Sequence, residues 1–198
     1  MGCELGQVFS RFGTKVTIAE GSDRLLVLEE PEASEVIAGA FAAEGIDVVL
    51  GRQVTQVREA DGSISATLSD GVTLTAEKLL VAAGRVVDLE PLGLDNAGIK
   101  TNGPFIDVDD HLRAAEGIWA MGDVIGRGMF THMALHEGAI VADQLLGNEV
   151  QAADHSSLPR VTFTDPEVGA VGISEAAADA AGLDIAVTVK QVPFSSRG

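Results

Sequence analysis

A helical pattern followed closely by a short β-branched strand occurs twice in the first 50 residues, and this order most constrains the fold. The first pair covers residues 2–13 and 15–20, and the second covers residues 31–44 and 46–50. Alternating helices and short buried strands are typical of α/β domains with a parallel sheet. The helical faces expected to be apolar are formed by Leu5, Val8, Phe9 and Phe12, and by Val36, Ile37, Ala40 and Phe41. We therefore predict an α/β fold in which the strand before the first helix is missing.

The pattern changes to period 2 over residues 53–83, where Asp61-Gly62 and Asp70-Gly71 are strong turn signals. These residues predict an antiparallel meander that returns to a buried strand, Lys78–Ala83. Two short strands around a turn are expected within residues 105–124.

A further helix is predicted over residues 131–146, and its inner side is expected to carry Met133, Ala134, Ile140, Val141 and Leu145. Residues 148–157 form a polar joint, which is the best candidate for a domain boundary. Residues 159–192 then predict a strand, a turn, a strand, a short helix and a last strand.

The formal charge of −17 disfavours binding to the phosphates of nucleic acid and to the surface of anionic membranes. No apolar run approaches the roughly 18 residues that a membrane span requires. The first residues resemble neither a signal peptide nor a myristoylation signal, so a cytoplasmic protein is expected. Cys3 is the single cysteine, which excludes an internal disulfide, and it is interpreted as a packing thiol.

Gly2 begins the first helix, and Glu20 ends the following strand 18 residues later. In dinucleotide-binding folds a glycine stands at this helix start, and an acid about 20 residues on binds the adenosine ribose. A carboxylate there repels a 2′-phosphate, so NAD is favoured over NADP. The other interpretation is a capping glycine and a surface glutamate.

Gly122-Asp123 lies between an apolar run and the helix that begins near Thr131. A carboxylate at a strand end can bind a polyol, and glycine lets a ligand approach the backbone. The helix start offers free N–H groups to an electron-rich ring edge or a phosphate. A simple Gly-Asp turn is the alternative interpretation.

Metal binding has little support in the sequence. His132 and His136 have the spacing of metal ligands on a helix, but no clear third ligand accompanies them. The acidic residues around Asp109 are typical of a solvated turn. We therefore predict no metal site.

Four stretches resemble the class I pyridine nucleotide–disulfide oxidoreductases, which include dihydrolipoamide dehydrogenase, mercuric reductase and glutathione reductase. They occur in the family's order and at its spacing, and they are distributed over essentially the whole chain. The stretches are GCELGQVFSRFGTKVTIAE, LLVAAGRVVDLEPLGLDNAGI, GIWAMGDVIGRGMFTHMALHEG and PRVTFTDPEVGAVG.

The resemblance implies roles for individual residues. Gly2 matches the third glycine of the NAD fingerprint, Glu4 the acid beside the nicotinamide, and Glu20 the ribose-binding acid. Gly84 and Arg85 match the segment where the chain leaves the NAD domain. The residues that match the FAD site are Gly122 and Asp123 at the ribityl chain, and Phe130, Thr131 and His132 at the flavin pyrimidine edge.

The resemblance also implies three parts: residues 1–82 as an incomplete Rossmann-like NAD-binding domain, 83–152 as the returning part of an FAD-binding domain, and 153–198 as the start of an α+β dimerisation domain. The parent enzyme would be a homodimer that transfers electrons between NAD and a disulfide through FAD. The family's redox-active cysteine pair and catalytic His-Glu pair are absent, so no catalytic residue is assigned and the chain alone is expected to be inactive. A noncatalytic nucleotide-binding module and a soluble pyridine nucleotide transhydrogenase remain alternatives.

Overall fold

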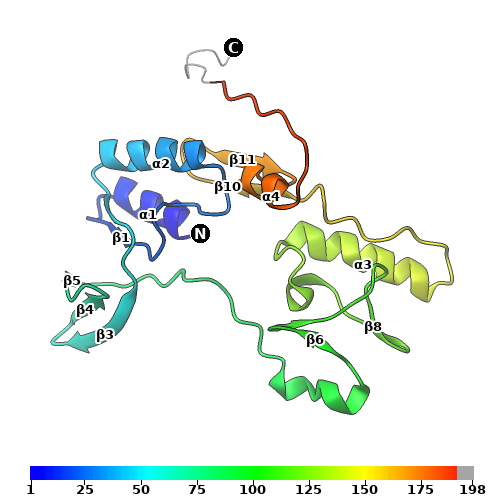
Figure 1. Ribbon diagram of the computed structural model, residues 1–198. Helices are drawn as coiled ribbons and strands as arrows, with labels where there is room; N and C mark the ends of the chain where they lie inside the picture. The colour runs from blue at the N-terminus through cyan, green and yellow to red at the C-terminus, as the bar shows by residue number, and fades with distance from the viewer. Residues whose placement is uncertain (191–198) are drawn as a thin grey trace. The chain divides into compact units, whose positions relative to one another are not determined.

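The chain folds into two compact units in the computed structural model, which describes residues 1–190 (Figure 1). Unit 1 consists of Met1–Val81 together with the described residues from Arg160 onward. Unit 2 consists of Ala82–Pro159. The chain therefore leaves unit 1 after the predicted meander and returns to it after the polar joint.

Unit 1 begins with the predicted alternation of helices and strands. The elements are α1 (Gly2–Arg11), β1 (Thr17–Ala19), α2 (Pro31–Ala43) and β2 (Asp47–Val49). The strands pair in parallel, with Ile18 opposite Val48, so the parallel α/β prediction is confirmed for this segment. The core beside the strands consists of Leu25, Ile37, Phe41 and Ile46.

The antiparallel meander is also confirmed. It consists of β3 (Val54–Ala60), β4 (Ser63–Leu68) and β5 (Thr73–Ala76), paired in the order β3-β4-β5. Asp61 and Gly62 both have positive φ, 53° and 75°, as a tight two-residue hairpin turn requires.

The predicted strand Lys78–Ala83 is wrong, because these residues form no strand. A strand exists only where a neighbouring strand pairs with its backbone, and no described strand pairs with this segment. Its apolar side chains stay partly in contact with solvent, and Val81 is 74% exposed. The period-2 pattern identified a segment suited to a sheet but could not supply the partner.

After the polar joint the chain forms β10 (Pro159–Thr162), β11 (Val168–Val171) and the short helix α4 (Glu175–Ala180). β10 and β11 pair in a two-stranded sheet, which confirms the predicted strand, turn, strand and helix. The last predicted strand is wrong for residues 184–190, which are exposed and form no strand. The remainder of that prediction, residues 191 and 192, lies outside the described residues.

Unit 2 consists of small strand pairs and one long helix. Its elements are η1 (Glu90–Leu92), η2 (Leu94–Ala97), β6 (Thr101–Asn102), β7 (Phe105–Ile106), β8 (Arg113–Ala115), β9 (Ile118–Trp119), η3 (Gly122–Ile125) and α3 (Thr131–Leu145). β6 pairs with β7 and β8 with β9, both antiparallel. Its core consists of Ile106, Val108, Leu112, Ala120, Ile125 and Val141.

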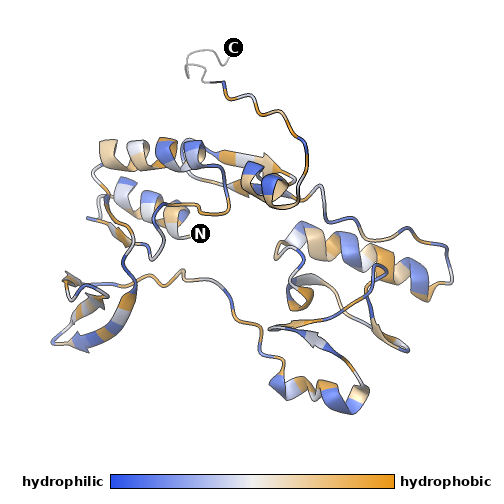
Figure 2. Ribbon diagram, in the orientation of Figure 1, coloured by the Kyte–Doolittle hydropathy of each residue, from blue (hydrophilic) through white to orange (hydrophobic). Residues whose placement is uncertain are grey.

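The helices bury fewer of the predicted apolar side chains than their periodicity indicates. Val8, Phe9 and Val36 are 42–45% exposed, Leu145 is 65% exposed, and Phe12, directly after α1, is 83% exposed. Gly6 and Gln7 are the buried residues of α1 instead. Figure 2 shows apolar and hydrophilic residues mixed along the ribbons of the helices. In the part of the chain that the structure describes, no helix is long and apolar enough to cross a membrane.

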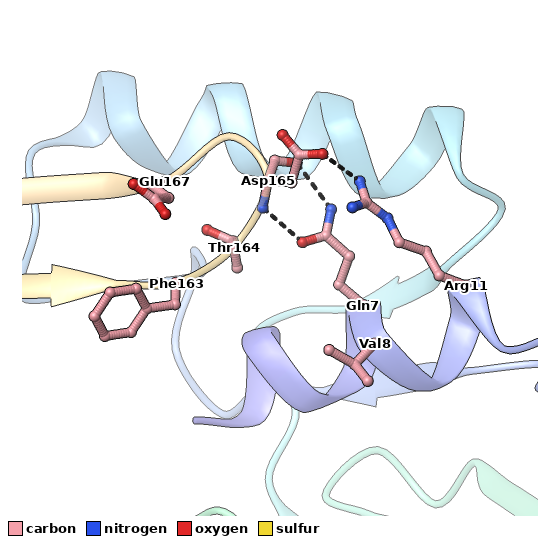
Figure 3. Close-up of a pocket in the computed structure, with 7 residues that line it drawn as sticks. All are labelled: Gln7, Val8, Arg11, Phe163, Thr164, Asp165 and Glu167. Carbon is pink, nitrogen blue, oxygen red and sulfur yellow. Dashed lines mark hydrogen bonds and ion pairs between the residues drawn. The ribbon is translucent and has the colours of Figure 1, made fainter.

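The turn between β10 and β11 is held against α1 by a network of polar side chains (Figure 3). Gln7 donates from Nε2 to the Asp165 carbonyl at 2.8 Å and accepts the Asp165 N–H at 2.7 Å. Arg11 donates to Glu44 and to Asp165, at 2.6 and 2.8 Å. A pocket of about 340 Å³ beside this network is lined by Gln7, Val8, Arg11, Phe163, Thr164, Asp165 and Glu167. The network therefore joins segments far apart in the sequence.

The hydrogen bond from Arg11 lowers the pKa of Glu44 below its ordinary value, and the Gln7 hydrogen bond adds to this effect. A carboxyl group with a lowered folded-state pKa stabilises the fold above its unfolded pKa, and this contribution is lost as the pH falls through the folded-state value. We therefore expect the free energy of unfolding to fall less between about pH 5 and pH 3 in Glu44→Gln than in the unsubstituted protein.

Denaturant titrations at several pH values measure this difference. Glu35→Gln, on the exposed face of α2, is the matched control and should keep the pH dependence of the unsubstituted protein. An unchanged pH dependence in Glu44→Gln would contradict the role of the network.

Candidate functional site

The start of α1 carries the acidic residue Glu4. Its Oε1 accepts the Phe163 N–H at 2.8 Å, and its Oε2 lies 2.7 Å from the Met1 ammonium. Burial acts to raise the pKa of Glu4, but these two hydrogen bonds and the ammonium charge outweigh burial and lower it. Gly2 is the first residue of α1, and no side chain caps this helix start. A carboxylate therefore lies beside a helix end that can bind a polar ligand through its N–H groups.

Glu20 lies directly after β1, at the carboxyl end of the parallel strand pair. Its N–H donates to the Val49 carbonyl at 2.8 Å, and its Oε1 accepts the Ser22 N–H at 2.8 Å. Ligands of open α/β sheets bind outside the carboxyl ends of the strands. The backbone thus fixes the Glu20 carboxylate at the edge where a nucleotide ribose is expected, and no described hydrogen bond occupies its Oε2.

Arg24, four residues after Glu20, and Arg52, whose backbone N–H donates to the Glu20 carbonyl, both form side-chain contacts within unit 1. Arg24 donates from Nη1 to Ser34 Oγ at 2.8 Å and from Nη2 to the Val27 carbonyl at 2.9 Å. Arg52 donates its backbone N–H to the Glu20 carbonyl, but its Nε lies 3.1 Å from Asp70 Oδ2. The sequence contained no signal for these pairings, and they leave Glu20 without an arginine partner among the described contacts.

In unit 2 the structure brings Arg85 and Asp123 together. Arg85 Nη1 forms an ion pair with Asp123 Oδ2, and the same atom lies 3.4 Å from the Met129 carbonyl oxygen. Gly84, which precedes Arg85, has a φ of 101°, a conformation that favours glycine. The Gly84-Arg85 segment and the Gly122-Asp123 turn, which the sequence indicated separately, are therefore in contact.

The turn at Gly122 has little space for a side chain. Gly122 has a φ of 75°, and a Cβ atom at this residue would lie 3.3 Å from the Ala134 Cβ of α3. Gly122 begins η3, so the Asp123 carboxylate projects from the first turn of that element. The glycine is required by both the backbone conformation and the close approach of α3.

The start of α3 lies beside this turn and has no side-chain cap. Phe130, the extended residue before the helix, accepts the Met133 and Ala134 N–H groups at its carbonyl. Among the described hydrogen bonds, none uses the N–H of Thr131 or His132. The Phe130 and His132 rings stack with centroids 5.3 Å apart, and His132 Nε2 lies 2.9 Å from the Pro159 carbonyl oxygen. Two amides at the positive end of a 15-residue helix are thus free for a ligand.

Sequence reasoning missed Glu137, whose carboxylate is completely buried in α3. Its Oε2 accepts the Gly122 N–H at 2.5 Å, and its Oε1 lies 2.9 Å from His155 Nε2. One signal was available, because Glu137 stands one helical turn from Met133 and from Val141, both buried. A charged residue in that apolar series indicates a specific internal partner.

The remaining candidates do not form a metal centre. No group of three or more histidine, cysteine or acidic side chains arranged for a metal ion occurs in residues 1–190. Cys3 lies at the edge of the unit 1 core, and burial raises the pKa of its thiol. A raised pKa keeps the thiol protonated and unreactive, which fits a packing role.

The chain is similar to known proteins over its whole length. Residues 1–138 match the family model described as pyridine nucleotide-disulphide oxidoreductase, and residues 158–198 match its dimerisation domain. Dihydrolipoyl dehydrogenase of Chlamydia pneumoniae is 32% identical over all of this chain, which covers 42% of that protein. Mercuric reductase of Streptomyces lividans is 40% identical over 92% of this chain, which covers 40% of that protein.

Solved structures give the same result. The flavoprotein disulfide reductase RclA of Escherichia coli, in a Cu(II) complex, is similar over 92% of this chain and 43% of its own, with a TM-score of 0.82 and 33% identity. LpdA of Mycobacterium tuberculosis is similar over 90% of this chain and 39% of its own, with a TM-score of 0.82 and 28% identity. The chain thus spans about two fifths of the length of these relatives. It belongs to the pyridine nucleotide-disulphide oxidoreductase family.

Proposed function

We propose that this chain forms part of an FAD-dependent oxidoreductase that transfers electrons between NADH and a disulfide or a related acceptor. We call the complete protein the parent enzyme. The observation that carries the proposal is the meeting of the Gly122-Asp123 turn with the uncapped start of α3, in a chain of this family. The relatives named dihydrolipoyl dehydrogenase, mercuric reductase and disulfide reductase support this class of reaction.

The residues of unit 2 fit FAD. Asp123 pairs with Arg85 through Oδ2, and no described hydrogen bond occupies its Oδ1, which can accept a ribityl hydroxyl. The absence of a side chain at Gly122 lets the ribityl chain approach the backbone. The free Thr131 and His132 amides can donate to the flavin pyrimidine edge, where negative charge increases on reduction. FAD, when bound, supplies the two-electron chemistry that protein side chains lack.

The residues of unit 1 fit NAD. Gly2 gives the pyrophosphate access to the start of α1, and Glu20 accepts hydrogen bonds from the adenosine ribose. Glu4 stands at the same helix start, where it can orient the nicotinamide. Arg24 and Arg52 contact Ser34 and Asp70, so neither is positioned in advance to neutralise a 2′-phosphate. This favours NAD over NADP.

In the parent enzyme, residues 1–82 are proposed to belong to the NAD-binding domain and residues 83–152 to the FAD-binding domain. Residues 153–198 are proposed to begin the dimerisation domain. The match of residues 158–198 to a dimerisation domain supports a homodimer. A cytoplasmic location is part of this proposal, as the resemblance to the family implies. The acceptor disulfide would meet residues outside this chain, because Cys3 is its single cysteine.

The first prediction concerns the activity of residues 1–198 alone. We expect no NADH-dependent reduction of lipoamide or of a chromogenic disulfide in the presence of added FAD, since the chain supplies no cysteine pair. Free FAD at the same concentration is the control. Turnover well above that of free flavin would mean that other residues of this chain perform the chemistry.

The second prediction concerns nucleotide choice in the parent enzyme. The kcat/KM for NADH should exceed that for NADPH by a factor on the order of 10 or more, because like charges repel at Glu20. Glu20→Ala should reduce this preference, and Asp23→Ala, an exposed acid three residues away, should leave it unchanged. Equal use of both nucleotides by the unsubstituted enzyme would contradict the assignment.

The third prediction concerns FAD. Loss of a hydrogen bond to a charged group costs on the order of 1.5–3 kcal/mol, so Asp123→Ala should raise the Kd for FAD roughly 10- to 150-fold in the parent enzyme. Fluorescence titration of the flavin-free enzyme measures this change. Asp110→Ala removes another exposed carboxylate of unit 2 and should bind FAD like the unsubstituted enzyme. The same result for Asp123→Ala would refute the proposed flavin contact.

A further inference from the structure

A completely buried carboxylate lies in the middle of α3, where apolar side chains are expected. Glu137 is 0% exposed, and its neighbours one turn away, Met133 and Val141, are also buried. Transfer of an ionised carboxylate out of water is costly unless the group is paired and hydrogen-bonded. The contacts of Glu137 therefore indicate its role.

Both carboxylate oxygens of Glu137 bind groups from other segments of unit 2. Oε2 accepts the Gly122 N–H at 2.5 Å, a buried hydrogen bond. Oε1 lies 2.9 Å from Nε2 of His155, whose side chain is 18% exposed and belongs to the polar joint. One side chain thus connects the long helix, the Gly122 turn and the segment that follows the helix.

The Gly122 N–H depends on this carboxylate. Met121 is extended and Gly122 has positive φ, so the peptide group between them turns toward α3. The Ala134 Cβ closely approaches the same turn, and no other described group accepts the Gly122 N–H. Because a buried amide without a partner costs free energy, loss of Glu137 would favour rotation of this peptide group.

We propose that Glu137 is a positioning residue for flavin binding, acting through the Gly122 peptide on the direction of the Asp123 carboxylate. His155 holds the second oxygen of Glu137 and thereby keeps the carboxylate pointed at the turn. Glu137 itself touches no ligand. The inference rests on the proposed function of Gly122 and Asp123 in FAD binding.

Two substitutions of similar size separate the hydrogen bond from packing. Glu137→Met fills the same volume without an acceptor, and Glu137→Gln keeps an acceptor oxygen for the Gly122 N–H. In the parent enzyme we expect Glu137→Met to raise the Kd for FAD about tenfold and Glu137→Gln to change it less than about threefold. His136→Ala, on the exposed face of the same helix, is the control and should bind FAD normally. Equal affinities of the Met and Gln variants would overturn the inference.

The same titration in an Asp123→Ala background tests whether Glu137 acts through Asp123. We expect Glu137→Met to add less than about twofold to the Kd there, because residues in one network are not additive. A repeated tenfold loss would assign Glu137 a general packing role and overturn the proposal. If Asp123→Ala itself left the affinity unchanged, the proposed function would fail. If Asp123→Ala weakened binding and Glu137→Met did not, the positioning inference alone would fail.

Hydrogen exchange of the unsubstituted, FAD-free enzyme supplies a measurement that needs no variant. The Gly122 amide should exchange at least about 100-fold more slowly than a free amide, because its hydrogen bond to Glu137 is buried. This measurement decides the question if Glu137→Met does not fold. Exchange at the rate of a free amide would overturn the proposal.

Discussion

Buried backbone amides must find hydrogen-bond partners, and this requirement determines where the candidate site residues lie. In unit 1 the parallel pairing of β1 with β2 satisfies the strand backbones and places Glu20 where the pairing ends. In unit 2 the Gly122 amide lies after the end of β9 and has no partner strand among the described residues. The Glu137 carboxylate accepts its hydrogen bond instead of a strand carbonyl. The two units thus form their candidate ligand-binding edges at the points where regular backbone pairing stops.

The two edges suit different ligands because their charges differ. The edge of unit 1 presents the carboxylate of Glu20, which suits the hydroxyls of ribose and disfavours an added phosphate. The edge of unit 2 presents one carboxylate, already paired with Arg85, beside free helix amides, which suit a polyol chain and an electron-rich ring. This difference in charge is what the proposal of NAD at unit 1 and FAD at unit 2 rests on.

Local signals predicted much of the fold, and non-local requirements account for the errors. Helix α2 and the hairpin turn at Asp61 depend on residues close in sequence, so periodicity and turn chemistry located both correctly. The segment Lys78–Ala83 needs a strand neighbour, which its own sequence cannot supply. Glu137 was missed for a similar reason, because its partners Gly122 and His155 lie 15 and 18 residues away. Family resemblance, rather than spacing, singled out Arg85, and the structure then paired it with Asp123.

A crystal structure of the parent enzyme with FAD and NAD bound would locate both cofactors. We expect a ribityl hydroxyl within hydrogen-bond distance of Asp123 and the flavin pyrimidine edge at the Thr131 and His132 amides. We also expect the adenosine ribose of NAD at the Glu20 carboxylate. FAD bound away from the Gly122-Asp123 turn, or NAD bound away from Glu20, would contradict the proposed binding sites.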